Sequence, residues 1–248
     1  MELLAIDQGN TTTKFGYFRA GELLRTWMVP TDKGATAEVL AKQLMAGGVS
    51  SPFALGLSTV TAELLPAWRR MAVESGYSLN IINGLTPASL RNKYLSPDTL
   101  GADRFMAAVA AAHYVGLPVI PISLGTAIVV DAVSNSGAYL GGIIAPGIAA
   151  STTALHHTAS ALPAGHWAPP TRAIARSTTE ALSNGLFYQS VGGVCAMVRA
   201  VRDELGVSAP LALHGGWAHL LAPHLEGVAL VDEHLVLRGI HLTLSQFG

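Results

Sequence analysis

Two short segments of the chain place glycine and small polar residues directly after an apolar run, an arrangement suited to binding phosphate. The segment AIDQGNT covers residues 5–11, and the segment PISLGTA covers residues 121–127. A tight glycine turn after a buried strand leaves backbone N–H groups pointing in one direction, and such a nest binds anions. The first segment has Asp7 where the second has Ser123. The similarity between the two segments indicates either a duplicated phosphate-binding turn that has lost one carboxylate, or only two similar strand ends.

The residues after the first turn add groups that suit phosphate. Thr11, Thr12 and Thr13 supply hydroxyl donors, and Lys14 supplies a positive charge. Asp7 could hold Mg²⁺, because this ion prefers a few carboxylates together with phosphate oxygens. The alternative is a polar hairpin mouth that binds nothing. The chain has no GxxxxGK[ST] loop and no GxGxxG motif, so the P-loop and Rossmann folds lack support.

The segment LGADR, residues 100–104, supplies a second acidic position. Asp103 is expected at or near the start of a helix, where free N–H groups and the helix dipole stabilise a carboxylate. It is either a plain helix cap or a general base that accepts a hydroxyl proton during phosphoryl transfer. Arg104 beside it is either a clamp for an anionic group or a surface cation.

The apolar pattern predicts strands that alternate with helices, which favours an α/β fold. Strands are expected at the segments LLAID, FALGLSTV, SLNIIN, LPVIPIS, AIVVDAV, AYLGGIIAPG and PLALHGG, with hairpin turns at residues 19–21 and 134–137. Helices are expected over residues 36–48, 62–76, 101–116 and 173–206, the last with an interruption near Gly192 and Gly193. The order of strand, turn, hairpin and helix occurs twice, starting near residues 3 and 118.

The composition narrows the class of protein. The chain has 248 residues, half of them hydrophobic and only 12% charged, so one large domain or two ordinary ones can bury a substantial core. The net charge is −1 and no basic stripe occurs, which argues against nucleic acid as a partner. The single cysteine, Cys195, excludes an internal disulfide and four-cysteine metal sites, and indicates a reducing cytoplasm.

A membrane span is not expected, although the mean hydropathy is +0.40. Residues 105–130 contain no Asp, Glu, Lys or Arg, but glycines and prolines interrupt this stretch. The first residues, MELLAID, do not form a signal peptide, because they have no basic region and no long apolar segment. We therefore expect a soluble protein.

The nine histidines do not predict a metal site. His214, His219 and His224 recur every five residues, which does not place a pair on one helix face beside an acidic ligand, and HExxH is absent. Solvated or capping histidines are expected instead. Cys195 lies in an apolar helical stretch and is expected in the core.

Several segments, in order, resemble motifs of the type III pantothenate kinases, a family of the actin-like, hexokinase-like ATPase superfamily. The resemblance covers nearly the whole chain. The segments are DQGNTTTK (7–14), STV (58–60), NKYLSPDTLGADR (92–104), LGTAIVVD (124–131), GGIIAPG (141–147), STTEALSNG (177–185), HGG (214–216) and HLVLRGI (234–240).

The resemblance implies an α/β fold of two tandem RNase H-like (actin-like ATPase) domains with mixed sheets flanked by helices. These would be an N-terminal domain over residues 1–115 and a C-terminal domain over residues 116–248, with ATP between them. The implied activity is phosphorylation of pantothenate to 4′-phosphopantothenate by ATP and Mg²⁺, the first step of coenzyme A biosynthesis. The resemblance also implies a cytoplasmic homodimer.

The resemblance further implies a role for each matching residue. Asp103 would be the catalytic base, and Asp7 would position Mg²⁺. The ATP phosphates would be bound by Asp7, Gln8, Gly9, Asn10, Thr11, Thr12, Thr13, Lys14, Gly125 and Thr126. Pantothenate would be bound by Tyr94, Gly101, Ala102, Asp103, Arg104 and, across the dimer interface, Thr178.

Three positions depart from the family's pattern. Ser123 stands where the family has an Asp that binds a monovalent cation (K⁺ or NH₄⁺), Val129 replaces a Thr, and His214 replaces the Thr before the late Gly-Gly pair. Serine offers a neutral oxygen but no charge. The chain could be a kinase independent of potassium, a kinase that holds the ion otherwise, or a degenerate paralogue that binds nucleotide or pantothenate without turnover.

Four matching residues favour an active enzyme: Asp7, Lys14, Asp103 and Arg104 are all present. A kinase of the same fold for another small hydroxylated substrate remains a further alternative.

Overall fold

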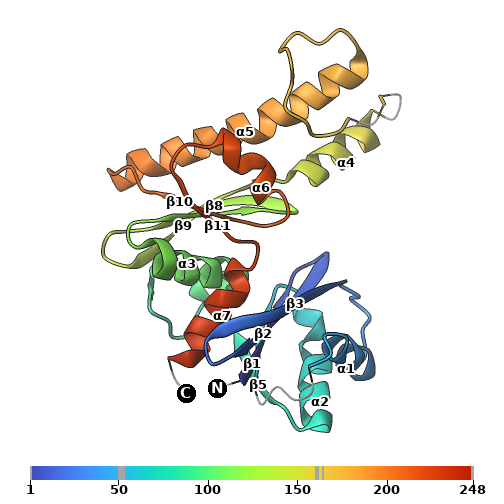
Figure 1. The fold of residues 1–248 in the computed structure, drawn as a ribbon, viewed down its shortest axis with the longest axis vertical. Helices are drawn as coiled ribbons and strands as arrows, with labels where there is room; N and C mark the ends of the chain where they lie inside the picture. Colours follow the sequence, from blue (N-terminus) through green and yellow to red (C-terminus); the bar gives the residue numbers. More distant parts are fainter. Residues whose placement is uncertain (1, 50–53, 160–161, 164, 247–248) are drawn as a thin grey trace. The chain divides into compact units, whose positions relative to one another are not determined.

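The computed structural model describes residues 2–49, 54–159, 162–163 and 165–246 (Figure 1). The chain divides into two compact units. Unit 1 comprises residues 1–114, 137–139 and 234–248, and unit 2 comprises residues 115–136 and 140–233. The C-terminal helix therefore belongs to unit 1, although it follows unit 2 in the chain. The division into domains at residues 115 and 116 stays a prediction.

Unit 1 is built on a sheet with the strand order β3-β2-β1-β4-β5. The strands are β1 (Glu2–Gln8), β2 (Thr12–Arg19), β3 (Glu22–Pro30), β4 (Ala54–Thr59) and β5 (Ser78–Ile82). β1, β2 and β3 form an antiparallel meander, whereas β4 and β5 run parallel to β1. The helices are α1 (Ala37–Met45), η1 (Ala62–Leu64), α2 (Leu65–Ser75), η2 (Pro97–Thr99), α3 (Ala102–Val115) and α7 (Leu235–Ser245). The short strand β6 (Arg91–Asn92) pairs with residues 138–139 of the same unit.

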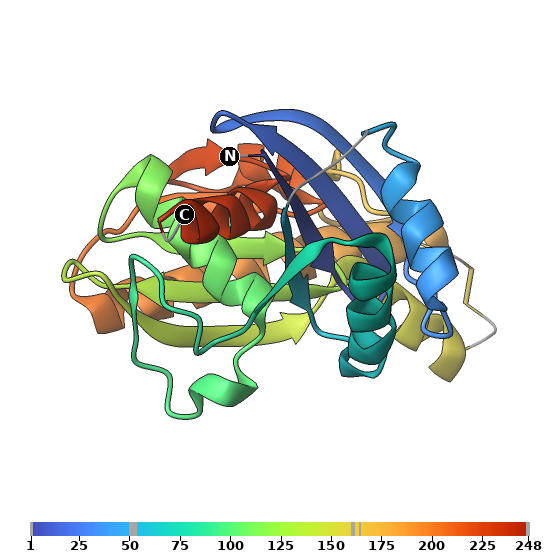
Figure 2. The ribbon, with the colours of Figure 1, turned by 90° about the horizontal axis from the view of Figure 1, so that it is seen from below.

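The two faces of this sheet are covered by different helices, because successive side chains of a strand point to opposite faces. Leu4 and Ile6 of β1 pack in a core that includes Leu40 of α1 and Trp68 of α2. On the other face α7 comes close to the backbone: a Cβ on Gly56 would lie 2.6 Å from its Ile240 side chain. Figure 2 shows α1 and α2 on one side of the strands and α7 on the other. Asp7 belongs to the α7 face.

Unit 2 repeats the same plan in the first five strands of a six-stranded sheet, whose full order is β11-β10-β7-β8-β9-β6. Its elements are β7 (Ile120–Leu124), β8 (Ala127–Val133), β9 (Ala138–Pro146), α4 (Ile148–Thr158), α5 (Thr178–Leu205), β10 (Leu211–His214), α6 (Ala218–Leu221), η3 (Ala222–His224) and β11 (Val228–Val231). Ile122 and Leu124 of β7 pack with Val194 and Val198 of α5 in one buried core. Figure 1 shows α5 lying along this sheet.

The repeated strand order confirms the predicted fold class. In each unit a central strand pairs antiparallel with the next strand and parallel with a later one: β1 with β2 and β4, and β7 with β8 and β10. The next strands outward also correspond: β3 follows β2 as β9 follows β8, and β5 follows β4 as β11 follows β10. The duplicated pattern of strand, turn and hairpin is therefore a duplication of architecture.

The predicted interruption of the long helix is wrong. α5 runs through Gly192 and Gly193 without a break over 28 residues, and it begins at Thr178 rather than at residue 173. The Ser177 side chain caps its start by accepting from the Glu180 N–H at 3.2 Å. Glycine costs a helix about 1 kcal/mol per residue, and burial of the apolar face that includes Val194 offsets that cost.

Candidate active site

The first strand end brings a carboxylate, an amine and a hydroxyl onto one face of the unit 1 sheet. Asp7 on β1 is in register with Lys14 on β2 and with Ser58 on β4. Cross-strand partners in register project to the same face, so these three side chains lie side by side. The Ser58 hydroxyl is completely buried and has no hydrogen-bond partner among the residues that the structure describes. The sequence predicted no role for Ser58 itself, although the STV segment (58–60) that contains it is one of those that resemble the family's motifs.

The electrostatic surroundings of Asp7 are unusual for a carboxyl group. Burial raises the pKa of Asp7 from 3.8 to about 7, with a second upward contribution from the charge of Asp103 and a smaller downward one from Lys14. Burial likewise raises the pKa of Asp103, while the backbone N–H and the charge of Arg104 lower it. The two carboxyl groups are thus coupled: each is desolvated, and the negative charge of Asp103 acts against ionisation of Asp7.

The start of α3 gathers the residues of the LGADR segment as predicted. Asp103 lies in the first turn of the helix. A Cβ on Gly101 would come 2.5 Å from the Asp103 Oδ1 atom, so glycine leaves the room that this carboxylate uses. The Arg104 guanidinium lies over the Tyr94 ring, 5.6 Å from its centroid. Ala102 is buried at the beginning of the helix. Unit 1 therefore holds Tyr94, Asp103 and Arg104 in one neighbourhood.

Two side chains predicted at the first phosphate turn point instead into the core. Gln8 and Thr13 are almost fully buried, because they alternate with Asp7 and Lys14 and so face α2 rather than α7. The Gln8 Oε1 atom accepts hydrogen bonds at 3.0 Å from Thr59, Thr61 and the Trp68 indole. The Gln8 and Thr13 side chains therefore anchor the end of β1 on the α2 face of the sheet, and only their backbone groups remain available to a ligand on the other face.

The exposed part of the first turn is its tip. The Gly9 N–H donates to the Thr12 carbonyl at 3.0 Å, closing the turn around Asn10 and Thr11. Both of these residues are exposed. Thr31 supports the turn from β3's end, because its hydroxyl donates to the Gly9 carbonyl at 2.8 Å.

In unit 2 the corresponding strand end, here called the second strand end, is the end of β7 at Ser123 and Leu124 together with the Gly125–Thr126 turn. Two glycines from other segments, Gly147 and Gly215, pack closely against it. A Cβ on Gly147 would collide with the Gly125 carbonyl, and a Cβ on Gly215 would lie 2.5 Å from the Leu124 carbonyl. The Gly147 N–H donates to the Thr126 carbonyl at 3.1 Å, while the Thr126 residue itself is exposed. Close packing against the backbone of residues 124–126 is therefore a physical reason for glycine at Gly147 and Gly215.

Three other residues of unit 2 that the sequence analysis considered lie at the start of a helix, at the end of a strand and beside the core. Thr178 is the first residue of α5 and is exposed. His214, expected to be solvated or capping, is instead buried at the end of β10, with 8% of its surface exposed. The burial of His214 could not be predicted from the spacing of the histidines, because that spacing does not indicate that residue 214 belongs to a buried strand. Cys195 packs against the unit 2 core from a partly buried position.

The donor set at the first strand end fits Mg²⁺. Within the described ranges no group of three or more His, Cys, Asp or Glu residues could hold a metal by itself. Mg²⁺ does not need one, because it usually binds one or two carboxylates and completes its coordination with phosphate oxygens and water. The mutual repulsion of Asp7 and Asp103 is the kind of strain that a divalent cation relieves.

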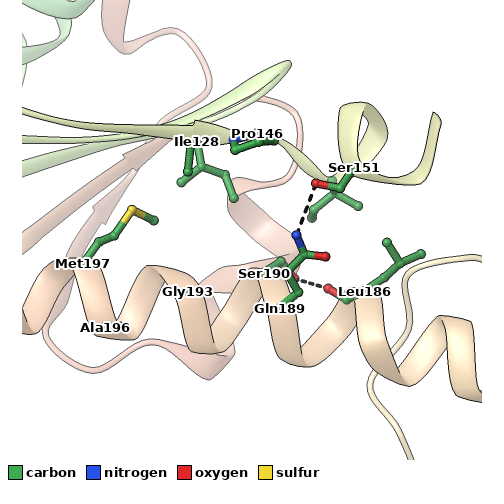
Figure 3. A pocket seen from close by; sticks show the side chains of 11 residues that line it. Ile128, Pro146, Ser151, Leu186, Gln189, Ser190, Gly193, Ala196 and Met197 are labelled. Carbon is green, nitrogen blue, oxygen red and sulfur yellow. Dashed lines mark hydrogen bonds between the residues drawn. The ribbon is translucent and has the colours of Figure 1, made fainter. Parts of the chain in front are cut away.

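Unit 2 contains an apolar cavity. It has a volume of about 370 Å³ and is lined by residues of β8, β9, α4 and α5, among them Ile128, Pro146, Leu186 and Met197 (Figure 3). The Gln189 side chain donates to the Ser151 hydroxyl at 3.5 Å at its edge. No acidic or basic side chain lines the cavity, so it offers no catalytic group.

The fold is that of solved ROK family kinases and related proteins. A ROK family glucokinase from Streptomyces griseus, solved with glucose and AMPPNP, matches with a TM-score of 0.57 at 14% identity over 100% of both chains. A conserved Campylobacter jejuni protein described as a Baf family transcriptional activator matches with a TM-score of 0.67 at 19% identity over 98% of both chains. At such identities the likeness establishes the fold alone.

Sequence comparison is more specific. The family model described as type III pantothenate kinase matches residues 3–200. A type III pantothenate kinase from Frankia alni is 37% identical over 249 residues, covering 98% of this chain and 99% of the relative. The chain belongs to the type III pantothenate kinase family.

Proposed function

We propose that the protein transfers the γ-phosphoryl group of ATP to the hydroxyl of pantothenate, giving 4′-phosphopantothenate and ADP as the first step of coenzyme A biosynthesis. The observation that carries this proposal is the coupled carboxyl pair of Asp7 and Asp103 beside Lys14, in a chain of this family. Phosphoryl transfer depends mainly on positioning and on charge stabilisation, and this group of side chains can supply both.

Asp103 is the proposed general base. As the pantothenate oxygen forms its bond to the γ-phosphorus and the bond to the ADP oxygen breaks, the hydroxyl proton passes to the Asp103 carboxylate. Burial raises the pKa of Asp103 toward neutral pH, and a general base is most effective when its pKa lies near the pH at which the enzyme works. The Arg104 N–H keeps the carboxylate oriented.

Arg104 and Tyr94 are the proposed contacts for pantothenate. The guanidinium is held over the tyrosine ring, which restricts its motion and prepares it for the substrate carboxylate. Gly101 and Ala102 would line the same place, because they open the helix that carries Asp103.

Asp7 and Lys14 are the proposed contacts for the metal-bound phosphates. Asp7 would hold Mg²⁺, which neutralises phosphate charge when it is bound. Lys14 would reach a phosphate oxygen, and the exposed tip at Asn10 and Thr11 would donate backbone N–H groups. In unit 2 the turn at Gly125 and Thr126 is the proposed second phosphate contact.

A homodimer is the proposed assembly. α4 and α5 expose Leu155 and Tyr188, with 42% and 51% of their surfaces accessible, which suits contact with a second copy. The exposed Thr178 would then meet the partner's pantothenate. Light scattering should give about twice the 25.8 kDa of one chain; a mass equal to one chain would remove the support for this role of Thr178.

A cytoplasmic location is also proposed. No helix in the described parts of the chain has both the length and the apolar character needed to span a bilayer. The single cysteine agrees with a reducing compartment.

ADP release measured with and without pantothenate tests the function. We expect release that requires both pantothenate and Mg²⁺. Nucleotide binding without pantothenate-dependent release, in any monovalent salt, would instead favour the degenerate, non-catalytic alternative. Release with another small alcohol but not with pantothenate would favour a kinase of different substrate.

A further inference from the structure

The three departures from the family's pattern meet at one place in unit 2. Ser123 at the end of β7 is in register with Val129 on β8 and with His214 on β10. The residues are far apart in the sequence, yet they are immediate cross-strand neighbours. Partners in register project to one face of a sheet, so the three side chains form a single row, here called the 123–129–214 row.

The row lies at the edge of the sheet where ligands bind in folds of this kind. β7 and β10 are parallel, and both end here; in α/β sheets, ligands bind beyond the carboxyl ends of the strands. Ser123 is followed by the Gly125–Thr126 turn, and His214 is followed by Gly215, which packs on the Leu124 carbonyl. The row also lies opposite the core, because Ile122 and Leu124 occupy the other face.

The chemistry of the row does not fit a monovalent cation. It offers one neutral hydroxyl oxygen, one hydrocarbon and one imidazole, whereas alkali cations are hard ions that bind several oxygens. The carboxylate nearest along β8 is Asp131, which is buried and lies against β9: a Cβ on Gly142 would be 2.5 Å from its Oδ1 atom. The Asp131 Oδ1 atom therefore lies beside β9, the neighbour of β8 on the side away from β7.

An imidazole can supply a hydrogen-bond donor to an anionic oxygen at the position where the family's pattern has a cation site. At least one ring nitrogen of a histidine carries a proton at any pH and can donate to an anionic oxygen, while the other nitrogen fixes the ring. A hydroxyl or a valine cannot provide that donor from a comparable reach. His214 is buried beside the second turn, so its ring position is constrained.

We propose that the 123–129–214 row does not bind a monovalent cation and that the His214 imidazole donates to the phosphates of the bound nucleotide in its place. The three substitutions then form one coordinated change rather than the decay of a site. This inference rests on the proposed function for the identity of the ligand. Its tests use nucleotide binding and thermal unfolding, so a failure of pantothenate turnover alone would leave it standing.

The first test is a cation series. Thermal unfolding of the wild-type chain with Mg²⁺·ADP is followed in KCl, NH₄Cl, NaCl and choline chloride at equal ionic strength. The expected result is the same midpoint in all four salts. A saturable stabilisation by K⁺ or NH₄⁺ alone would overturn the inference.

The second test rebuilds the cation site. The triple variant Ser123→Asp, Val129→Thr, His214→Thr should gain a K⁺-specific rise in its unfolding midpoint with Mg²⁺·ADP. If the folded variant responds to no cation, these three positions are not where the cation site was lost. Ser208→Asp, at an exposed position before β10, controls for the added charge.

The third test isolates the imidazole by calorimetric titration with Mg²⁺·ADP. His214→Thr should bind about tenfold more weakly, since a hydrogen bond to a charged group is worth a factor of this order. His214→Gln, which retains an N–H donor, should recover most of the affinity; added K⁺ should not. Unchanged affinity in His214→Thr would refute the role of the ring. His219→Thr, on the exposed side of α6, is the matched control.

Discussion

At the end of β1, Asp7 is flanked in register by Lys14 and Ser58, whereas at the equivalent end of β7, Ser123 is flanked by Val129 and His214. The strands around both positions follow the same order. One copy of the duplicated plan therefore presents an acid, a base and a hydroxyl, and the other presents only uncharged or imidazole groups.

The duplicated fold thus constrains the residues of the core more strongly than those at the strand ends. Leu4 and Ile6 in β1 correspond to Ile120 and Ile122 in β7, and all four are fully buried. Their alternation keeps each sheet packed on its helices. The residue at the strand end packs against less, so its chemistry can change without cost to the fold.

The largest expected effect comes from Asp103, the carboxyl group whose charge acts on Asp7 at the end of β1. Asp103→Asn should lower pantothenate-dependent ADP release by about 10²–10⁴-fold, the usual contribution of a general base. Asp98→Asn, at an exposed position of the same segment, should stay near wild type. Equal rates for the two variants would remove Asp103 from the reaction and weaken the contrast between the strand ends.

Loss of the Lys14 ammonium group beside Asp7 should have an intermediate effect on the kinetics. Lys14→Met should raise the KM for ATP by about tenfold or more, because a hydrogen bond to a charged group contributes about 1.5–3 kcal/mol. The comparison variant is Lys42→Met, since Lys42 is an exposed cation of α1. If initial-rate kinetics give the same KM for both variants, Lys14 does not contact the phosphates.

The buried carboxyl should also leave a trace in the pH dependence of stability. Asp7 has a folded-state pKa of about 7 and an unfolded value near 3.8, so the folded state binds the proton more tightly. Stability is therefore highest below pH 4 for this group, falls as the pH rises from about 4 to about 7, and is then constant.

Asp7→Asn removes that loss, because asparagine does not ionise. The melting temperature of the variant relative to wild type should increase by about 5 °C between pH 4.5 and pH 8, taking about 2 kcal/mol after a discount for partial exposure. Differential scanning fluorimetry without Mg²⁺ or nucleotide measures it. A constant difference between the two proteins across this range would show that Asp7 ionises normally.

A smaller effect is expected from the glycine loops of the second strand end. Gly215 has φ +96° and packs on the Leu124 carbonyl, whereas the equivalent residue after Ser58 is Thr59, whose side chain binds Gln8. Gly215→Ala should lower the free energy of unfolding by about 1–3 kcal/mol.

Gly192→Ala provides the contrast in the same unit and the smallest effect. No atom lies within 4 Å of a Cβ built there, and the residue is helical. The substitution should stabilise by about 0.5–1 kcal/mol. Chemical denaturation of both variants tests the pair; a loss of stability on Gly192→Ala would place a packing partner on that face of α5.

Much of the fold could be predicted because the local signals were strong. The hairpin at residues 19–21 has glycine at a left-handed position, and α1 follows a Thr36 cap. The error at Gly192 and Gly193 arose because local propensity indicates a break, while the buried side of α5 holds the helix together. Propensity loses to tertiary packing in such cases.

The chemistry of the site was predicted only in part, because several of its contacts join residues that are far apart in the sequence. Asp7, Lys14 and Asp103 came from short motifs, but the burial of Gln8 depends on Trp68, 60 residues away, which donates to it. Likewise, His214 becomes a neighbour of Ser123 only through the pairing of β10 with β7. Parallel pairing between distant strands leaves no mark in the local sequence.

Asp7 at the end of β1 and Asp103 at the start of α3 form a coupled, desolvated pair of carboxyl groups, and a carbon-13 NMR titration of Asp-labelled protein can show this coupling. With signals assigned through Asp7→Asn and Asp103→Asn, the Asp7 carboxyl should titrate near pH 7. Its midpoint should fall in the Asp103→Asn variant, because the neighbouring charge is gone. A midpoint near 3.8 that ignores Asp103→Asn would contradict the account.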